Sequence, residues 1–375
     1  MTLHILPRRA DARRVETLRL REFPSRALVV AATAKMPYRV IQCLTDAGVA
    51  TYGLGSGIAG GLRHSRRLAG FSRLPTPVDG TAPAPLVAEV NAAIARWGID
   101  VVVPGDAQGT RSLIAMRDRL AAPCFPMPDL RLFDRLNDKW EFYNLCRTLG
   151  VEVPASWVFA SVEALTAAHR AGAFVRETIA KPLSLTGGEG CVRIDPRHPA
   201  DGLAKIDYAP ILVQDYIEGE DIGASALCER GKVRAFIAHR YGRNVYQTFH
   251  DPRVLKVVEA IAAAVRYDGV CNFDMRLAAD GRIYYLECNP RIYFKMMMSK
   301  LAGVDFVGMA LGRKEKREPV LGAPTKVRLP KALLLSLWAP WRIEPQSWRA
   351  LRMTLADPIP YLREEFGLDE DLRKD

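Results

Sequence analysis

The feature that most constrains the fold is the stretch 267–291, which reads as two strands joined by a tight turn. Asp280-Gly281 is a strong hairpin signal between them. Asp274 lies midway along the first strand, and Glu287 and Asn289 share one face of the second. Antiparallel pairing would bring Asp274 beside Glu287, and two carboxylates with an amide oxygen suit a hard cation such as Mg²⁺. The alternative is a hairpin with a solvated acidic face.

The length and composition are those of a chain with two or three domains and no membrane span. It has 375 residues, too many for one small domain, and no run of eighteen apolar residues. The arginine-rich N-terminus lacks the apolar region of a secretory signal. Seven cysteines are scattered without a CxxC pair, which argues against a zinc site or a disulfide framework. We therefore expect a cytoplasmic protein with reduced thiols.

The chain is strongly basic, because 53 lysines and arginines against 42 acidic residues give a formal net charge of +11. A basic surface attracts anions such as nucleotides, phosphorylated substrates, nucleic acid or acidic lipid. No recognisable nucleic-acid module accompanies the charge. We therefore expect the charge to serve solubility and nucleotide attraction, and we do not expect nucleic-acid binding.

Residues 26–129 read as a small open α/β layer. Strands are predicted at 26–32, 49–54 and 100–104, and helices at 37–47, 87–97 and 110–120. A strand, a helix and a second strand in this length favour a right-handed βαβ unit on a parallel sheet. The glycine-rich run 53–57 follows the second strand rather than the first, so it is not a dinucleotide fingerprint. The region shows no catalytic constellation.

The next region carries two lysines at the ends of predicted elements. A helix is expected from Phe133 to Gly150, with Asn137 or Asp138 as a candidate N-cap. A strand ends at Lys181-Pro182, and the glycine-rich loop 183–190 and a return strand follow. Such a unit can fold over phosphates because glycines let backbone N–H groups approach their oxygens. The loop lacks the GK[ST] ending of the Walker motif, and an ordinary hairpin is the alternative.

Three strands and an amphipathic helix connect this region to the hairpin. They are predicted at 211–217, 222–227, 233–240 and, for the helix, 252–266. The first of these strands ends in the run Gln214-Asp215-Tyr216-Ile217, and an acidic turn follows at 218–221.

Five motifs in one order resemble the ATP-grasp superfamily, of the carboxylate–amine ligase type. They are Lys139, Lys181 with its glycine loop, the run 214–221, Asp274, and Glu287-Cys288-Asn289-Pro290-Arg291. The resemblance covers about residues 26–311. It implies an α/β + α+β protein, in which an N-terminal Rossmann-like pre-ATP-grasp domain precedes a two-lobed ATP-grasp fold that clasps ATP.

The implied domains follow from the same resemblance. They are a basic N-terminal extension (1–25), the pre-ATP-grasp domain (26–129), the ATP-grasp domain (130–312, with a small lobe at about 130–210 and a large lobe at about 211–312) and a C-terminal extension (313–375).

The resemblance also implies which residues contact the nucleotide. They are Lys139, Lys181, Gly187, Gly188, Gln214, Asp215, Tyr216, Ile217 and Asp221. The two lysines would hold the ATP phosphates, a task that suits point charges on flexible stems. Gln214 to Ile217 would form the hinge strand at the adenine, with Tyr216 and Ile217 against its faces. Asp221, or Glu220 instead, would accept from the ribose hydroxyls.

Metal and phosphoryl contacts are implied on the hairpin. Asp274, Glu287 and Asn289 resemble ligands of one or two Mg²⁺ ions, with Mn²⁺ as the alternative metal. Arg291 resembles the arginine that contacts the transferred phosphoryl group. Together with Arg240 and Lys295 it completes the set of candidate catalytic residues.

Some of these candidates carry an alternative interpretation. Arg240 and His239 end a strand that lies near the phosphates in this family. Lys295 follows the last motif, where it would bind a substrate carboxylate or be an ordinary surface lysine, and Met296–Met298 are expected in the core. Asn272 stands where D-alanine–D-alanine ligases place an arginine, which argues against that subfamily.

The implied reaction activates a carboxylate with ATP as an acylphosphate and joins it to an amine, releasing ADP and phosphate. The expected partners are small-molecule carboxylate and amine substrates, and the sequence leaves their identity open. It also leaves open whether the protein forms a homodimer. A phosphoryl transferase and a nucleotide-binding regulatory protein are the alternatives. The intact set of hairpin residues argues against a regulatory protein without turnover.

Beyond residue 312 the family pattern fades. Residues 331–342 are apolar with basic flanks and aromatic ends. Such a segment lies on a membrane surface or packs against the body of the protein, and we favour the second. Residues 357–361 are proline-rich and predicted to be extended, and residues 363–375 are expected in solvent.

Overall fold

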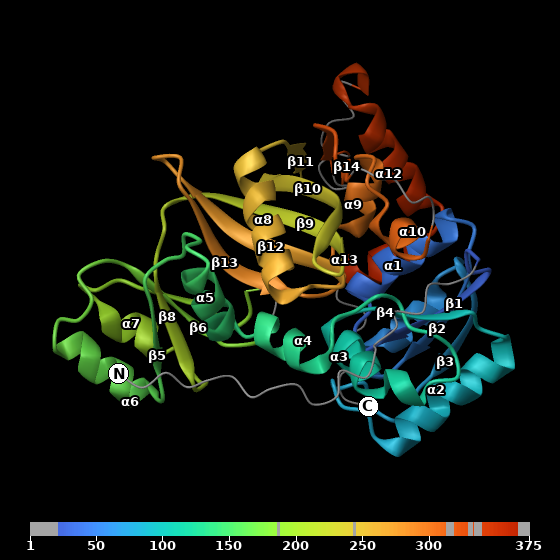
Figure 1. Cartoon of the computed structure of the whole chain (residues 1–375), viewed down its shortest axis with the longest axis horizontal. Helices are drawn as coiled ribbons and strands as arrows, with labels where there is room; N and C mark the ends of the chain where they lie inside the picture. Colours follow the sequence, from blue (N-terminus) through green and yellow to red (C-terminus); the bar gives the residue numbers. More distant parts are fainter. Residues whose placement is uncertain are drawn as a thin grey trace.

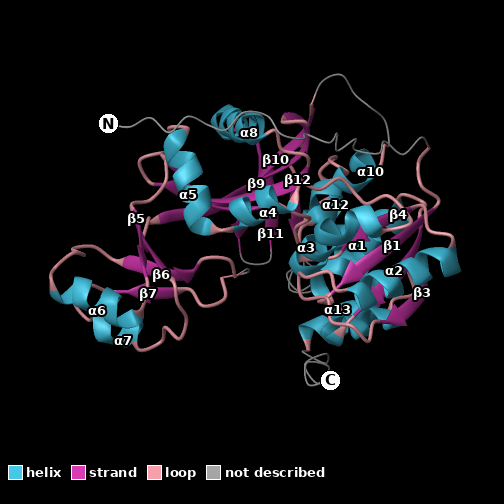
Figure 2. Ribbon diagram, turned by 60° about the horizontal axis from the view of Figure 1, so that its bottom comes forward, coloured by secondary structure: helices cyan, strands magenta, loops and turns pink. Residues whose placement is uncertain are grey.

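Three sheets make up the protein, one after another along the molecule (Figure 1). The structure is a computed structural model and describes residues 22–185, 188–242, 245–312, 319–328, 333 and 340–366. In the views of Figures 1 and 2, the large sheet lies between a parallel sheet and a smaller antiparallel sheet.

The first sheet is parallel and has the strand order β3-β2-β1-β4. Its strands are β1 (Arg26–Ala31), β2 (Ala50–Gly55), β3 (Leu68–Arg73) and β4 (Val101–Pro104). The helices are α1 (Lys35–Asp46), α2 (Ala84–Trp97) and α3 (Ala107–Met116), with 3-10 turns η1 (Gly57–His64) and η2 (Arg117–Arg119). The sequence did not predict β3 or η1. β3 is partly exposed along its length, so it lacks the apolar signal of its neighbours.

Asp106 holds the carboxyl ends of β1 and β4 together. Its buried carboxylate accepts hydrogen bonds from Ala32 N at 2.8 Å, Thr33 N at 2.7 Å and Gly109 N at 2.8 Å. The last of these caps α3. The sequence analysis did not identify this role, because the partners in the β1–α1 turn are distant from Asp106 along the chain.

The small sheet is antiparallel, with the order β5-β8-β6-β7. It consists of β5 (Ser156–Phe159), β6 (Thr178–Pro182), β7 (Val192–Ile194) and β8 (Ile211–Asp215), with α6 (Val162–Arg170) and α7 (Pro199–Leu203) beside it (Figure 2). The predicted lobe boundary at residue 210 differs from this arrangement, because β8 pairs with β5 and β6 rather than with the large sheet. Helical signals and turns do not reveal which sheet a buried strand joins.

The large sheet contains the hairpin from which the sequence analysis started. It has the order β13-β12-β9-β10-β11-β15, with β14 paired to β10. Its strands are β9 (Gly219–Glu229), β10 (Lys232–Gly242), β11 (Val245–Phe249), β12 (Gly269–Ala278), β13 (Ile283–Asn289), β14 (Val320–Leu321) and β15 (Lys326–Arg328). The predicted pairing of Asp274 with Glu287 is confirmed.

Helices that precede and follow the small sheet along the chain pack on the large sheet. They are α4 (Leu130–Asn137), α5 (Lys139–Thr148) and α8 (Pro252–Val265), followed after the hairpin by α9 (Met296–Leu301) and α10 (Phe306–Ala310). Asp138 separates α4 from α5 and caps α5, accepting from Trp140 N and Glu141 N at 2.9 Å. Apolar side chains of α4, α5 and α8 share one core with the strands. Met296–Met298 are buried, as predicted.

The C-terminal region is part of the body of the protein. Beyond residue 312, β14 and β15 extend the large sheet, and η3 (Pro340–Arg342), α12 (Pro345–Leu355) and α13 (Pro358–Glu365) follow. The predicted extended segment at 357–361 is wrong, because Pro358 begins a helix there; proline suits the first turn, where its missing N–H has no partner to lose. α13 contacts η1 and α1.

No helix in the described part of the chain is long and apolar enough to cross a membrane. The segment 331–342 lies mostly outside the described residues. Within it, Leu333 is fully buried and Trp341 is 78% exposed.

Asp357 anchors the C-terminal helices to the first sheet's domain. It is fully buried, its carboxylate accepts from Ser65 Oγ at 2.5 Å and from Arg66 N at 3.0 Å, and its backbone oxygen accepts from Tyr38 Oη at 2.7 Å. We expect Asp357→Ala to lower the free energy of unfolding by about 2–4 kcal/mol, because it leaves buried donors unsatisfied. Urea denaturation measures this.

Asp280→Ala is the matched control, since Asp280 pairs with Arg282 at the exposed hairpin turn. It should leave the urea midpoint nearly unchanged. An equal midpoint for Asp357→Ala and the unmodified chain would contradict the anchoring role.

Candidate active site

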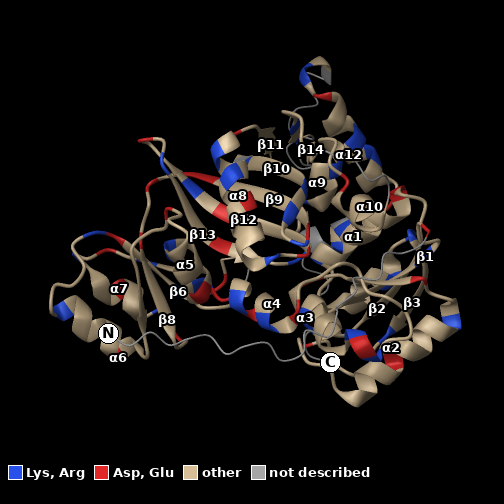
Figure 3. Ribbon diagram, viewed as in Figure 1, with Lys and Arg blue, Asp and Glu red and all other residues tan. Residues whose placement is uncertain are grey.

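A row of side chains crosses one face of the large sheet. Glu287 pairs with Asp274, Asp274 with Gly223, and Gly223 with His239, on four adjacent strands. Residues directly opposite one another on adjacent strands point to the same face. The row therefore brings an acid pair from the hairpin and a histidine from β10 onto one surface. Figure 3 shows acidic stretches on the strands of this region.

Asp274 and Glu287 form a pair of neighbouring carboxylates. Asp274 accepts from Asn272 Nδ2 at 3.0 Å and from Asn289 Nδ2 at 2.9 Å. Burial and the adjacent Glu287 raise the pKa of Asp274 to about 7. Burial alone would raise the pKa of Glu287 as well, but Lys139 and its other partners outweigh it and lower that pKa. The pair therefore retains one proton below about pH 7.

Lys139 and Lys181 approach this acid pair from two other elements. Lys139 begins α5, and its Nζ lies 3.2 Å from Glu287 Oε2 and donates to the Leu185 oxygen at 2.8 Å. Lys181 is on β6 of the small sheet, and its Nζ donates to Gln214 Oε1 at 2.8 Å. Both lysines are buried. Burial lowers the pKa of Lys181, while the charge of Glu287 opposes that shift.

The donor set on the hairpin fits a hard divalent cation. Asp274, Glu287 and the Asn289 amide offer oxygen ligands, which Mg²⁺ and Mn²⁺ prefer. Burial and the neighbouring Glu287 raise the pKa of Asp274, and a cation bound between the two carboxylates would offset both effects. Among the described residues, no group of three or more acidic, histidine or cysteine side chains gathers as a metal site, so the third candidate ligand here is the Asn289 amide.

Arg291 follows the hairpin and is almost fully buried. Its Nη1 donates to Asn289 Oδ1, and its Nε is buried without a hydrogen-bond partner among the described residues. Burial lowers the pKa of Arg291, while Glu287, Asp274 and more distant Asp106 oppose the shift. The arginine thus lies where the hairpin meets the first sheet's domain.

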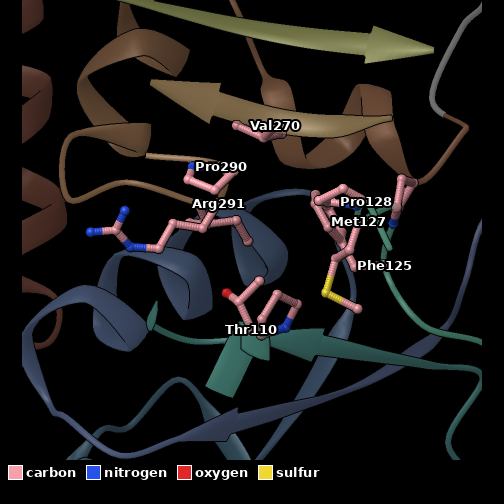
Figure 4. A pocket seen from close by; sticks show the side chains of 10 residues that line it. Thr110, Phe125, Met127, Pro128, Val270, Pro290 and Arg291 are labelled. Atoms are coloured by element: carbon pink, nitrogen blue, oxygen red, sulfur yellow. The ribbon is translucent and has the colours of Figure 1, made fainter. Parts of the chain in front are cut away.

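A small pocket marks that junction (Figure 4). Its lining comes from the first domain and from the end of the hairpin: Pro104, Thr110, Phe125, Pro126, Met127, Pro128, Val270, Pro290, Arg291 and Ile292. In Figure 4 the guanidinium of Arg291 extends away from the apolar wall of Phe125 and Met127.

Lys295 and His239 occupy the same side of the sheet. Burial lowers the pKa of Lys295 to about 8, opposed by the charge of Asp274. His239 is fully buried between Tyr246 and Tyr293, with ring centroids 5.2 Å and 6.1 Å away. Burial and the charge of Lys295 lower the pKa of His239 to about 3. Gly223 makes room for this ring, because a Cβ there would lie 2.6 Å from His239 Nε2.

The structure does not bring Arg240 to this face. Arg240 pairs with Ile222, one position out of step with the row of Asp274 and His239. Because side chains alternate along a strand, it points to the opposite side. There it pairs with Glu220 at 3.3 Å and lies over the Phe249 ring, 4.7 Å from its centroid. The sequence analysis named both neighbours, and of the two only His239 lies on the face of the acid pair.

Several polar groups of the predicted hinge residues already make hydrogen bonds within the small lobe. Gln214 uses its side chain to hold Lys181 and Ser156. Asp215 is partly buried, which raises its pKa. The N–H groups of Asp215 and Tyr216 donate within the small lobe, to the oxygens of Ala155 and Glu177 at 2.9 Å.

Arg276 is a site residue that the sequence analysis missed. It lies on β12 two residues after Asp274, and its guanidinium donates to Ile217 O at 3.0 Å, Asp221 Oδ1 at 2.6 Å and Tyr216 Oη at 2.9 Å. The ribose acid implied by the resemblance is therefore already ion-paired. The even spacing Asn272, Asp274, Arg276 on one strand face was the available signal.

Tyr216 lies between two guanidinium groups. Arg193 is 3.9 Å and Arg276 is 5.3 Å from the centre of its ring. At least part of the ring that was expected to face adenine is thus covered by Arg193. Gly188 adopts a left-handed conformation (φ 77°) in the glycine loop, and Gly187 lies outside the described residues.

Comparison with known proteins finds one family match and a distant curated relative. Residues 207–330 match the family described as ATP-grasp in the biosynthetic pathway with Ter operon. The carbamoyl phosphate synthase large chain of Thermomicrobium roseum is 26% identical over 226 residues, which cover 54% of this chain and 21% of that protein. The chain thus spans about a fifth of this curated relative's length.

Three solved structures are similar over most of their length. The biotin carboxylase domain of Hydrogenobacter thermophilus 2-oxoglutarate carboxylase, a dimer with MgADP and bicarbonate, has a TM-score of 0.61 and 16% identity, covering 80% of this chain and 72% of that one. L-amino acid ligase from Bacillus licheniformis has a TM-score of 0.60 and 16% identity, covering 78% and 76%. N5-carboxyaminoimidazole ribonucleotide synthetase with ADP has a TM-score of 0.60 and 13% identity, covering 81% and 79%.

The acid pair predicts a pH-dependent difference in stability. Between its unfolded pKa and about 7, folded Asp274 holds a proton that the unfolded chain releases, so its contribution to stability falls as pH rises through this window. Asp274→Asn is neutral throughout. We expect its free energy of unfolding, relative to the unmodified chain, to rise by up to roughly 1.4 kcal/mol per pH unit between pH 5 and 7.

Urea denaturation of both proteins without divalent cations, at several pH values, measures this difference. His239, whose lowered pKa makes stability rise with pH from about 3 to its unfolded value, is present in both chains and cancels. A difference that does not change with pH would contradict the shared proton.

Proposed function

We propose that this chain, which has the ATP-grasp fold and belongs to the ATP-grasp superfamily, is an ATP-dependent ligase that activates a substrate carboxylate and joins it to an amine. Two neighbours in the fold hold ADP and a third is an amino acid ligase, which supports the proposal. The first, parallel domain is then the Rossmann-like pre-ATP-grasp domain, and the enzyme works in the cytoplasm.

One observation carries the proposal. Lys139 from α5 and Lys181 from the small sheet converge on the carboxylates of Asp274 and Glu287 on the large sheet. Nucleoside triphosphates bind cationic side chains, here from α5 and the small sheet, and their divalent metal binds paired carboxylates, here on the large sheet.

The protein's part in the proposed reaction is alignment and charge neutralisation. Lys139 and Lys181 bind the phosphates of ATP, and Arg291 offers its unpartnered Nε to the phosphoryl group in transfer. Asp274, Glu287 and Asn289 would hold Mg²⁺, which supplies further neutralisation of phosphate charge. A substrate carboxylate oxygen attacks the γ-phosphorus, the bond to the β-bridging oxygen breaks, and ADP leaves.

The second step joins the amine. Its nitrogen attacks the acyl carbon, phosphate leaves, and the nitrogen loses a proton. Lys295, whose burial lowers its pKa to about 8, lies on the face where this transfer occurs and binds a substrate carboxylate there. The glycine loop 183–190, whose Leu185 oxygen bonds Lys139, excludes water from the acylphosphate.

The adenine end is positioned by Arg276. Since one guanidinium binds the hinge backbone at Ile217 O and the side chains of Tyr216 and Asp221, it joins the end of the small lobe to the strand that carries Asp274. Arg276 is therefore a positioning residue, and the ribose hydroxyls share Asp221 with it.

Asp274→Ala and Glu287→Ala should each abolish ADP release, by at least about a thousandfold, because either removes a ligand of the charge-neutralising metal. The assay measures ADP from ATP with pools of amino acids and other small acids, followed by mass spectrometry of the product. Circular dichroism checks that the variants fold.

Arg282→Met is the matched control on the same hairpin, since that side chain is 60% exposed, and its ion pair with Asp280 and its contact with the Tyr284 ring lie at the exposed turn. It should retain activity. Full activity of either alanine variant would exclude the metal assignment, and no ADP release with any pool would favour a regulatory protein.

Arg276→Met should raise the KM for ATP about tenfold and leave kcat within threefold, since it removes bonds to the hinge without touching the phosphates. Arg282→Met again serves as control. Steady-state kinetics with varied ATP separate the two constants; an unchanged KM would show that Arg276 only stabilises the fold.

A further inference from the structure

A second row of side chains lies beside Asp274 on the large sheet. Asn289 on β13 pairs with Asn272 on β12, and Asn272 pairs with Ser225 on β9, three strands that lie side by side in Figure 1. Asn272 stands two residues before Asp274, and residues two apart on a strand point to the same face. The second row therefore shares the surface of the acid pair and places polar side chains directly beside it.

The two amides of this row each hold one oxygen of Asp274. Asn272 Nδ2 donates to Asp274 Oδ1 at 3.0 Å, and Asn289 Nδ2 donates to Asp274 Oδ2 at 2.9 Å. An ionised carboxylate only accepts hydrogen bonds, so each amide must present its NH₂ group to it. Two donors on the two oxygens fix the plane of the carboxylate as well as its position.

The oxygens of the two amides are bound to different groups. Asn289 Oδ1 accepts from Arg291, the candidate phosphoryl contact. Asn272 Oδ1 accepts from Ser225 Oγ at 2.8 Å. Ser225 is fully buried and Asn272 is 4% exposed, so little water competes for this bond. The Asn272 oxygen is thus committed to Ser225, which makes Asn272 unsuited as a metal ligand and suited to hold one in place.

The Ser225 hydroxyl supports the orientation in which the Asn272 amide donates to Asp274. An amide has an acceptor oxygen at one end and an NH₂ donor at the other, and the two ends are nearly equal in shape. In the reverse orientation the amide oxygen would face the carboxylate and repel it. Without the hydroxyl, the buried amide oxygen would lose its donor, and the amide would have to shift to find another. Its hold on Asp274 would then loosen.

Tyr293 fixes the Ser225 hydroxyl from its other side. The hydroxyls of Ser225, Ser299 and Tyr246 all hydrogen-bond with that of Tyr293, and Ser299 Oγ also lies 3.0 Å from Tyr246 Oη. Since Ser225 has a single proton and gives it to Asn272, Tyr293 must be the donor in its bond to Ser225. The hydroxyl therefore has a fixed direction, and hydrogen bonds in series strengthen one another.

We propose that Ser225 and Asn272 are positioning residues: Ser225 orients the Asn272 amide, and the amide holds Asp274 in the geometry of a divalent-metal ligand. The inference rests on the proposed function, which makes Asp274 a ligand. Groups that hydrogen-bond to metal ligands orient them, and their removal typically weakens metal binding about 10- to 100-fold. A pair with only a packing role would change stability and leave the metal affinity as it is.

Metal binding tests the positioning role without turnover. Mn²⁺ is titrated into the full chain, without nucleotide and with ADP, and free Mn²⁺ is measured by electron paramagnetic resonance. We expect Ser225→Ala, which removes one hydroxyl and little volume, to weaken Mn²⁺ binding at least about tenfold. Asn272→Leu, which keeps the size of the side chain without its polar atoms, should weaken it as much or more. Because Ser225 acts through Asn272, the double variant should bind Mn²⁺ like Asn272→Leu alone.

Ser112→Ala is the matched control, because Ser112 is also a fully buried serine and accepts from Gly80 N at 3.1 Å in the first sheet's domain. It should lower the unfolding temperature as Ser225→Ala does and bind Mn²⁺ like the unmodified chain. The proposal is overturned when Ser225→Ala binds Mn²⁺ unchanged, or when Ser112→Ala weakens binding equally. Circular dichroism checks the fold, and Ser225→Ala tests the link even where Asn272→Leu does not fold.

The dependence of turnover on metal separates positioning from damage to the fold. In the ADP-release assay, Ser225→Ala should raise the Mg²⁺ concentration for half-maximal rate at least about tenfold. At saturating Mg²⁺ its kcat should return to within about threefold of the unmodified chain, because the ligands themselves are intact. A kcat that stays low at every Mg²⁺ concentration, with an unchanged half-maximal concentration, would overturn the positioning role.

The positioning role and the ligase function fail in different ways. ADP release by the unmodified chain, with unchanged Mn²⁺ binding in Ser225→Ala, overturns the positioning role and leaves the ligase function intact. No ADP release with any acid overturns the ligase function, and the Mn²⁺ titrations then decide the positioning role by themselves. No Mn²⁺ binding by the unmodified chain, with or without ADP, overturns the metal assignment of Asp274 and the positioning role together.

Discussion

The contact between Asp274 and Glu287 is the constraint on which the site depends. Two carboxylates side by side on neighbouring strands repel each other, and burial increases the cost. The structure offsets this by a shared proton, by amide donors from Asn272 and Asn289, and by Lys139 at 3.2 Å. A divalent cation bound between the two carboxylates would offset the same repulsion, which is why we propose the pair as metal ligands.

The same sheet face fixes what surrounds the pair. Gly223 lets His239 lie over β9, since a Cβ on Gly223 would lie 2.6 Å from the histidine ring. Arg276, farther along β12, bonds to the backbone oxygen of Ile217 in the predicted hinge. Along the other direction, Arg291 and Lys295 leave the hairpin toward α1 of the first domain. One strand pair therefore connects the groups that we propose for the phosphates, the base and the substrate, which is why we expect substitutions along β12 to change different kinetic constants.

Much of the fold and of the candidate site was predictable because the signals are local. The Asp280-Gly281 turn and alternating strands define the hairpin, and the Asp274–Glu287 pairing follows from it. Lys139 and Lys181 follow from their positions at element ends. The predictions that failed depend on contacts between distant parts of the chain. Whether Arg240 or His239 faces the acid pair depends on one residue of register, and no local pattern indicates which sheet β8 joins. Arg276 bonds to residues 55 to 60 positions away along the chain.

The sequence by itself determined the elements, the acid pair and the order of the motifs, because periodicity, turn chemistry and short spacings are properties of the chain alone. Tertiary structure decided which of these groups meet. It placed Arg39 under Phe294, set the first turn of α1 on the turn after β4, and committed Gln214 to Lys181. Such contacts arise when separate sheets pack, and no spacing along the sequence encodes a distance between sheets.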